Sequence, residues 1–204
     1  MPTTLPLFPL KVVIFPEGLL PLKIFEARYL DMVRDCLRNQ SDFGVVTTDT
    51  SSHKDQGSER LPFSLYGTSM SILEADVPQP GLMTLRCQGK RGFYVRTARQ
   101  QGNGLWIGEV DELPAASSKP IPDDLLNTSL YLQRLIDSLS EQGVADNELP
   151  ALKPFKLNDC EWVANRWCEM LDIPLSQKLK LMEVKEPLER LTMISDILRL
   201  YLQN

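Results

Sequence analysis

The chain has 204 residues and a formal net charge of −5. Apolar residues make up 43% of it and charged residues 24%, which is the balance of a globular protein with a substantial core. The acidic balance argues against general binding to nucleic-acid phosphates and against a polybasic contact with a membrane. No stretch approaches the ~20 consecutive apolar residues of a membrane span, and the N-terminus lacks a secretory-signal pattern, so we expect a cytoplasmic protein.

The segment from Leu5 to Ile24 consists of short apolar runs that four prolines interrupt: Pro6, Pro9, Pro16 and Pro21. Proline lacks a backbone donor and holds the preceding residue in an extended conformation. The pattern therefore predicts short strands and corners rather than a helix. Pro16-Glu17-Gly18 predicts a turn in which the glycine adopts a positive φ.

The period changes at Phe25, where an amphipathic helix of about three turns is expected. Its apolar face consists of Phe25, Tyr29, Met32, Val33, Cys36 and Leu37. The charged residues of the opposite face, from Glu26 to Arg38, have the spacing that allows i,i+3 and i,i+4 ion pairs.

Short strands separated by glycine and proline turns follow. The predicted strands are Phe43–Thr48, Leu65–Val77, Leu82–Cys87, Phe93–Ala98 and Leu105–Val110. The predicted turns include Gly89–Gly92 and Gly102–Gly104, and residues 49–62, with the only histidine, His53, are expected to be an exposed loop. Closely spaced strands of this kind favour a closed or half-closed antiparallel sheet.

The last third of the chain has helical patterns. Leu113–Pro122 contains three prolines with Ala and Ser and is typical of a linker. A broad apolar helical face begins after Asp123 and ends near Gly143. We therefore divide the chain into a β-rich subdomain (1–112), a linker (113–122) and a helical subdomain (123–204).

Three more helices are expected beyond residue 157. Asn158, with Glu161 three residues later, predicts the cap of the first of them. Ser176 and Pro187 are suited to begin the next two. Several helices with short connections predict a small bundle.

The blocks FPEGLLPLKIFEARY, YGTSMSILEADVPQPGLMTLRCQGKRGFYV and WVANRWCEML, with the later PLERL, resemble the N-terminal (substrate-binding) domain family of Lon proteases. The resemblance runs from Leu5 to about Leu202. It implies an α+β fold, with an N-terminal β-rich PUA-like pseudobarrel that includes one helix and a C-terminal helical bundle. The family usually has Arg directly before Phe, whereas Gly92 here separates Arg91 from Phe93, which predicts a bulge or a longer turn.

The resemblance implies a non-catalytic, stand-alone module that binds unfolded or apolar polypeptide segments or a partner protein, as an adaptor or regulator of proteolysis. Its candidate peptide-binding residues are Phe25, Tyr29 and Arg91. We expect no enzyme activity, because the chain lacks a GxxxxGK[ST] phosphate loop and the resembling segments leave no room for a Ser-Lys peptidase domain. One histidine and four cysteines without CxxC spacing predict no metal or cofactor site.

An RNA-binding PUA-like protein is the alternative function. It requires a basic patch, for which Lys90, Arg91, Arg96 and Arg99 are the available side chains. Arg96 and Arg99 are expected on opposite sides of one strand, which weakens that patch. The sequence leaves open the ligand, the binding surface and the oligomeric state.

Overall fold

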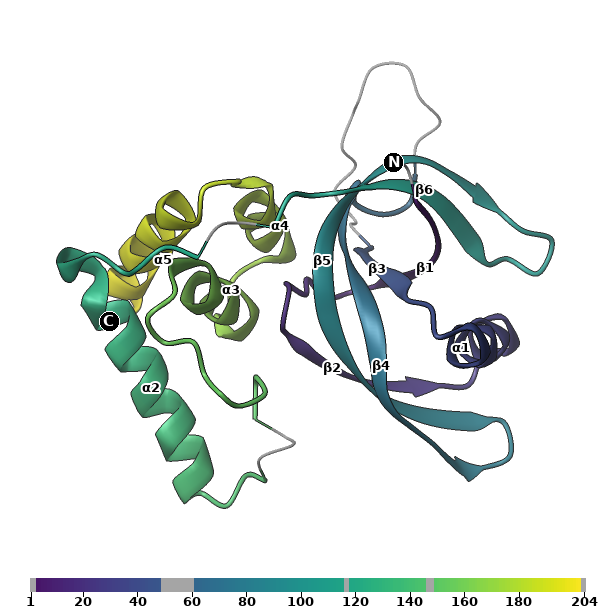
Figure 1. Ribbon diagram of the computed structural model, residues 1–204, viewed down its shortest axis with the longest axis horizontal. Coiled ribbons are helices and arrows are strands. Elements are labelled where there is room, and N and C mark those ends of the chain that lie inside the picture. Colours follow the sequence, from purple (N-terminus) through teal and green to yellow (C-terminus); the bar gives the residue numbers. More distant parts are fainter. Residues whose placement is uncertain (1–2, 49–60, 116–117, 146–148, 203–204) are drawn as a thin grey trace. The chain divides into compact units, whose positions relative to one another are not determined.

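The computed structural model describes residues 3–48, 61–115, 118–145 and 149–202. The chain forms two compact units, residues 1–114 and 115–204 (Figure 1). Residues 49–60 of the loop predicted at 49–62, with His53, lie outside the described residues. Each unit is described below by itself.

The described part of unit 1 is a mostly antiparallel sheet of six strands with one helix, as expected for a PUA-like pseudobarrel. Its elements are β1 (Thr3–Leu10), β2 (Leu19–Ile24), α1 (Ala27–Asn39), β3 (Phe43–Thr47), β4 (Tyr66–Gln79), β5 (Leu82–Gln100) and β6 (Trp106–Glu112). The strand order is β2-β5-β4-β3-β1-β6, and β6 also pairs with β5. Five strands therefore close on themselves, and β1 and β3 are the parallel neighbours.

One predicted turn is wrong, because β5 runs without interruption through Gly89–Gly92. The first part of β5 pairs with β2 and its last part pairs with β6. Strand β4 pairs with β5 between Leu82 and Tyr94, so its pairing overlaps both parts. Gly89 allows the backbone at Phe15 to approach β5 closely, because a Cβ at position 89 would lie 2.3 Å from the carbonyl oxygen of Phe15. The backbone of Gly89 also accepts from the amide of Glu17 at 2.8 Å and donates to the oxygen of Gly18 at 2.9 Å.

The predicted turn between β1 and β2 is present, but a different residue has the positive φ. Glu17 has φ 66°, and the amide of Gly18 donates to the oxygen of Phe15 at 3.1 Å. The glycine follows the left-handed residue instead of occupying that position.

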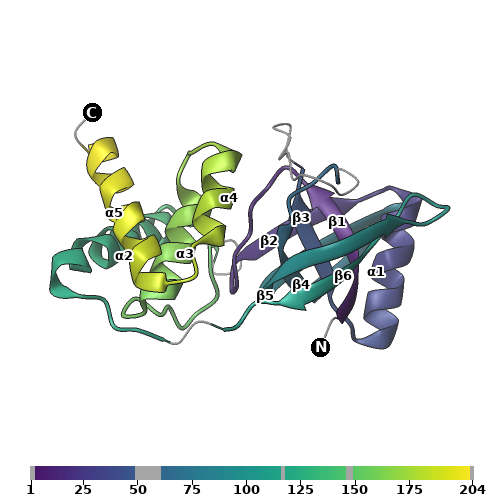
Figure 2. The ribbon, with the colours of Figure 1, turned by 90° about the horizontal axis from the view of Figure 1, so that it is seen from above.

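Helix α1 buries its apolar face in the larger of two hydrophobic clusters of unit 1. Tyr29, Met32 and Val33 pack there with side chains of β1, β3 and β5. Both hairpins, β4–β5 and β5–β6, project towards the side on which α1 lies (Figures 1 and 2). The predicted ion pairs of the outer face form between Arg34 and Asp31 (2.8 Å) and between Arg38 and Asp35 (3.1 Å).

The second cluster fills the centre of the pseudobarrel around Phe93. It consists of Leu5, Leu7, Val46, Phe63, Phe93, Val95 and Val110. The ring of Phe93 lies against two glycines, since a Cβ on Gly67 would come within 2.6 Å of it and one on Gly44 within 2.8 Å. Any larger residue at either position would displace the ring or the strand.

Unit 2 is the expected helical bundle. Its elements are the 3-10 helix η1 (Asp123–Leu125), α2 (Leu126–Glu141), α3 (Cys160–Met170), α4 (Leu175–Glu183) and α5 (Pro187–Leu202). Helix α3 contacts α2, α4 and α5. As predicted, α2 ends near Gly143, which has a positive φ, and Pro187 is the first residue of α5.

The capping residue of α3 differs from the predicted one. Asp159, not Asn158, has the extended backbone of an N-cap, and its carboxylate accepts from the amide of Trp162 at 2.8 Å. The predicted helix start was therefore one residue early, because both side chains are good caps and their order alone does not choose between them.

Candidate functional site

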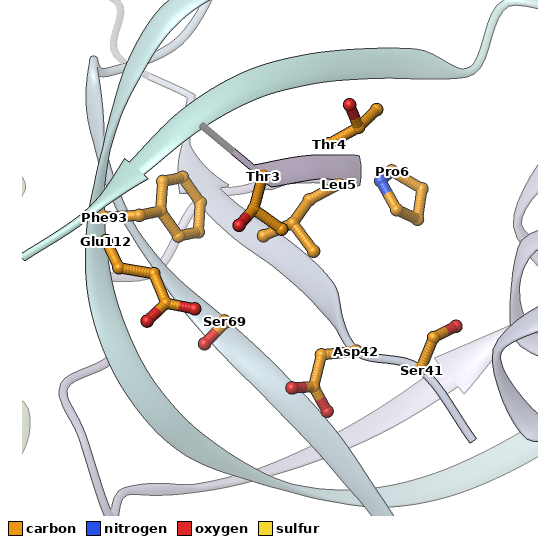
Figure 3. A pocket seen from close by; sticks show the side chains of 9 residues that line it. All are labelled: Thr3, Thr4, Leu5, Pro6, Ser41, Asp42, Ser69, Phe93 and Glu112. Carbon is orange, nitrogen blue, oxygen red and sulfur yellow. The ribbon is translucent and has the colours of Figure 1, made fainter. Parts of the chain in front are cut away.

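A pocket of about 250 Å³ lies in unit 1 where β1 and β3 separate (Figure 3). The parallel pairing of these strands begins at Leu7 and Gly44, so the first four residues of β1 pair with β6 alone. If that register continued backwards, Thr4 would face Ser41. We call this opening the β1 slot; it is lined by Thr3, Thr4, Leu5, Pro6, Ser41, Asp42, Ser69, Phe93 and Glu112.

The residues just after the end of α1 line the slot. Gln40 leaves the helix with a left-handed φ of 51°, and the amide of Ser41 donates back to the oxygen of Cys36 at 3.0 Å. Ser41 and Asp42 follow this helix end and precede β3, which begins at Phe43, so neither takes part in the pairing with β1.

The slot has an apolar floor and a polar rim. Leu5 and Phe93, which are 9% and 1% exposed, belong to the central cluster. Figure 3 shows the carboxylates of Glu112 and Asp42 on either side of Ser69. An apolar base with a few polar groups around it is the usual composition of a binding site.

The backbone of β1 supplies further polar groups to the slot. The amide of Thr48 donates to the oxygen of Leu10 at 2.7 Å, so Leu10 directs its backbone groups towards β3. Successive residues of a strand alternate in this direction, and the register of β1 contains no shift. Pro6 and Thr4 therefore also direct their backbone groups away from β6. The N–H and oxygen of Thr4 lie along the slot, whereas the parallel register, with Leu7 opposite Gly44, engages the oxygen of Pro6 with β3.

Arg91 lies at the rim of this slot, because the predicted bulge is present beside it. The pairing of β4 with β5 shifts so that two residues, Lys90 and Arg91, face the single residue Ser69. The Ser69 hydroxyl stabilises the bulge: it accepts from the amide of Arg91 and donates to its oxygen, both at 3.2 Å. A bulge changes the direction of side chains, here towards the rim carboxylates.

Two ion pairs connect the bulge to that rim. Lys90 Nζ lies 2.9 Å from the carboxylate of Asp42, and Arg91 Nε lies 3.7 Å from that of Glu112. Both basic side chains are about half exposed (53%). Such exposed pairs contribute little stability and can exchange partners easily.

The other two predicted contact residues lie elsewhere. Phe25 lies outside α1, immediately before the N-cap residue Glu26, and is 71% exposed. Tyr29 is 6% exposed and stacks on Phe8 with ring centroids 4.1 Å apart. Ile24 pairs with Met83, and Arg91 follows Met83 by eight residues on β5. That is about 26 Å of strand, so the structure does not bring Phe25 and Arg91 together.

The basic side chains that an RNA-binding patch would need have acidic partners. Besides the two rim pairs, Arg96 binds the carboxylate of Asp111. Three of the four candidate positions are thus next to a carboxylate, which reduces the positive potential that phosphate groups would meet.

The cysteines have the character of core residues. All four are buried free thiols. Burial raises the pKa of Cys87 and of Cys168 to about 12, so both stay protonated at neutral pH. In the part of the chain that the structure describes, no three His, Cys, Asp or Glu side chains gather as a metal site requires.

Most residues of the slot were not foreseen from the sequence. Thr4, Asp42, Ser69 and Glu112 come from four separate segments, and only the pairing of those segments unites them. One signal was available: a proline inside a strand, here Pro6, is confined to an edge or an unpaired side.

The fold and its closed sheet define an α+β protein in which a PUA-like pseudobarrel precedes a helical bundle. Residues 4–199 match the family model described as "ATP-dependent protease La (LON) substrate-binding domain". The chain therefore belongs to the Lon substrate-binding domain family.

Solved structures agree with this assignment. A Lon N-terminal domain protein from Xanthomonas campestris is 32% identical, has a TM-score of 0.74, and is matched over 95% of this chain and 98% of that one. The N-terminal domain of the Mycobacterium avium complex Lon protease shares the fold at 15% identity, with a TM-score of 0.61 over 95% and 97% of the two chains.

Full-length relatives extend beyond the matched region. The Lon protease of Anaeromyxobacter dehalogenans is 23% identical over 97% of this chain, and Lon protease 2 of Myxococcus xanthus is 22% identical over 97%. The chain spans 23% and 24% of their respective lengths. None of the helices in the described ranges has the length and apolar character needed to span a membrane.

Proposed function

We propose that this chain is a non-catalytic module that binds unfolded or exposed apolar segments of other polypeptides and acts as an adaptor or regulator of proteolysis. The match of residues 4–199 to a substrate-binding domain carries this proposal. The connection to a protease is part of the proposal, since the chain spans about a quarter of its full-length relatives.

Two accessible features of unit 1 support polypeptide binding. Phe25 exposes 71% of its surface, which is unusual for a phenylalanine and typical of an aromatic contact residue. Arg91 stands half exposed beside the slot. We propose both as contact residues, with Tyr29 supporting α1 from inside the core.

The charges favour a polypeptide over RNA. The net charge is −5, and the ion pairs of Lys90, Arg91 and Arg96 place carboxylates beside the basic side chains. The four cysteines are buried free thiols, which is compatible with a reducing compartment. We therefore propose that the protein is located in the cytoplasm.

The direct test is fluorescence anisotropy with labelled lactalbumin in its unfolded form, reduced and carboxymethylated, and in its native form. We expect the unfolded form to bind with a dissociation constant in the tens of micromolar and the native form to bind at least tenfold more weakly. A labelled RNA 20-mer at low salt is the competing probe. Binding of the RNA alone, or of neither probe, would contradict the proposal.

Phe25 can be tested with a matched control on the other unit. Phe25→Ser should weaken binding of the unfolded probe several-fold, because it removes a large exposed apolar contact. Leu130→Ser changes a residue of α2 that is 54% exposed and should leave the affinity unchanged. Equal losses from both variants would show that neither position marks the binding surface.

A further inference from the structure

We propose that the β1 slot is the site at which an extended segment of the bound polypeptide adds a strand beside β1. This inference rests on the proposed function and gives it a place and a binding mode. The occupant is one extended chain with an aliphatic side chain that enters the slot.

The first argument is the set of backbone groups along the slot. The N–H and oxygen of Thr4 point away from β6, and the pairing with β3, which begins with Leu7 opposite Gly44, extends no further towards the N-terminus than the oxygen of Pro6. An edge with donors and acceptors in strand geometry is complementary to another extended backbone, and peptides commonly bind by adding to such an edge.

Pro6 strengthens this argument. At a residue whose backbone faced β6, a proline would remove a hydrogen bond from the closed sheet. Its backbone instead faces the slot, so the proline leaves the pairing of β1 with β6 complete. Pro6 also has no N–H to offer and its oxygen is engaged by β3, so the backbone hydrogen bonds to an incoming strand would come from Thr4.

The second argument is the shape and chemistry of the slot. Side chains of an added strand alternate between its two faces, so one of them would point towards Leu5 and Phe93 on the apolar floor. The volume of about 250 Å³ lies below the roughly 300–1,000 Å³ of sites for drug-sized ligands. It suits one or two side chains of a passing chain better than a free cofactor.

The third argument is the rim. Asp42 and Glu112 hold their basic partners only through half-exposed ion pairs on the bulge of β5. These polar groups can stay solvated while the apolar side chain is buried between them, which is the usual arrangement of a polypeptide interface.

A backbone variant with a side-chain control tests the site. Thr4→Pro removes the N–H that faces the slot and leaves the pairing with β6, because the backbone of that residue points the other way. Thr4→Val keeps the N–H and removes the hydroxyl. With unfolded lactalbumin as the probe, we expect Thr4→Pro to weaken binding about fivefold or more and Thr4→Val to stay within twofold of the unchanged protein.

A second pair of variants covers the case in which Thr4→Pro fails to fold. Ser41→Trp places an indole across the slot from the opposite side, on an exposed residue, and Ser41→Ala is its control. We expect the tryptophan alone to weaken binding. Hydrogen exchange of the unchanged protein should also slow at the Thr4 amide when the probe saturates it.

The outcomes separate this inference from the proposed function. If the unchanged protein binds the probe but both Thr4→Pro and Ser41→Trp bind equally well, the slot is not the site and the proposed function stands. If the unchanged protein does not bind the probe at all, both fail. If light scattering shows a dimer that Thr4→Pro dissociates, the occupant is a second copy of this chain and the proposed occupant is wrong.

Discussion

Arg190 joins three helices of unit 2 through one buried guanidinium. Its Nε donates to the oxygen of Leu181 at 2.9 Å and its Nη1 to Oδ1 of Asn165 at 2.6 Å, while Nη2 donates to the oxygen of Val184. Desolvation by burial lowers the pKa of this arginine, yet the three acceptors hold the charged form in place. Asn165 of α3 is thus part of a buried hydrogen-bond network with a structural role.

Replacing this arginine should destabilise unit 2 strongly. Arg190→Met leaves three acceptors without their donor, two of them in buried hydrogen bonds, and we expect it to lower the free energy of unfolding by about 3 kcal/mol. Urea denaturation measures the change. Arg199→Met, on the same helix but exposed and 3.5 Å from Asp196, should cost about 0.5 kcal/mol or less. A small effect at position 190 would show that water can replace the guanidinium.

The raised pKa of Cys87 should make stability depend on alkaline pH. Below about pH 9 the thiol is protonated in both the folded and the unfolded state. Above it, the unfolded thiol ionises near its ordinary value of 9.0 while the folded thiol holds its proton up to about 12, so rising pH favours unfolding. Between pH 7 and 10 we expect the unchanged protein to lose about 1.4 kcal/mol more than Cys87→Ala, measured by urea denaturation. Parallel losses in the two proteins would contradict the assignment.

Residues with local signals were predictable, and those with long-range roles were not. The face of α1 at Tyr29, Met32 and Val33 follows from a helical period. The exposure of Phe25 does not, because it depends on the helix beginning two residues later, at Ala27. The sequence pattern likewise gave no indication that Glu17, with its side chain, would take the left-handed conformation next to a glycine.

At the scale of elements, β5 is the strand on which the closure of the sheet depends. It pairs with β2, β4 and β6, and the loop before β2 crosses it at Gly89. The pattern of glycines predicted two strands and a turn, since glycine is common in turns. The actual reason for Gly89 is a neighbouring backbone that is distant in sequence, which no local pattern reports.

Gly89→Ala should therefore be costly. The new Cβ would lie 2.3 Å from the Phe15 oxygen, a backbone atom that cannot move aside without disturbing two hydrogen bonds. We expect a loss of about 2–3 kcal/mol in the free energy of unfolding, seen as a lower melting temperature. Gly102→Ala is the matched control, because a Cβ added there would meet no heavy atom within 4 Å and the φ of Gly102 is not in the left-handed region. Similar melting temperatures for the two variants would show that the loop before β2 shifts and accommodates the added methyl group.

At the scale of the whole molecule, the chain separates into units at residue 114. The two hydrophobic clusters of unit 1 draw only on residues of that unit. Unit 2 has its own buried side chains, among them Leu132, Trp167 and Leu191. The change from β-rich to helical sequence near the prolines of 113–122 indicates a boundary between two parts of different secondary structure, whereas no sequence pattern predicts the parallel pairing that creates the β1 slot.

We expect residues 1–114, produced alone, to fold. Circular dichroism should show strand structure and one cooperative thermal transition, because the closed sheet and its helix lie within this piece. Residues 115–204 should show helical structure when produced in the same way. A piece 1–114 without a cooperative transition would mean that its two clusters do not suffice for stability.

The pairing of β1 with β6 sets the order of events during synthesis. Thr3 has Val110 as its partner, more than 100 residues later, so Thr3 leaves the ribosome long before its partner does. Until β6 has been made, the side of β1 that will face it has no strand to pair with, and the contact order of this closure is high. The nascent chain thus passes through a long interval with an open sheet, during which its unpaired strand can make wrong contacts.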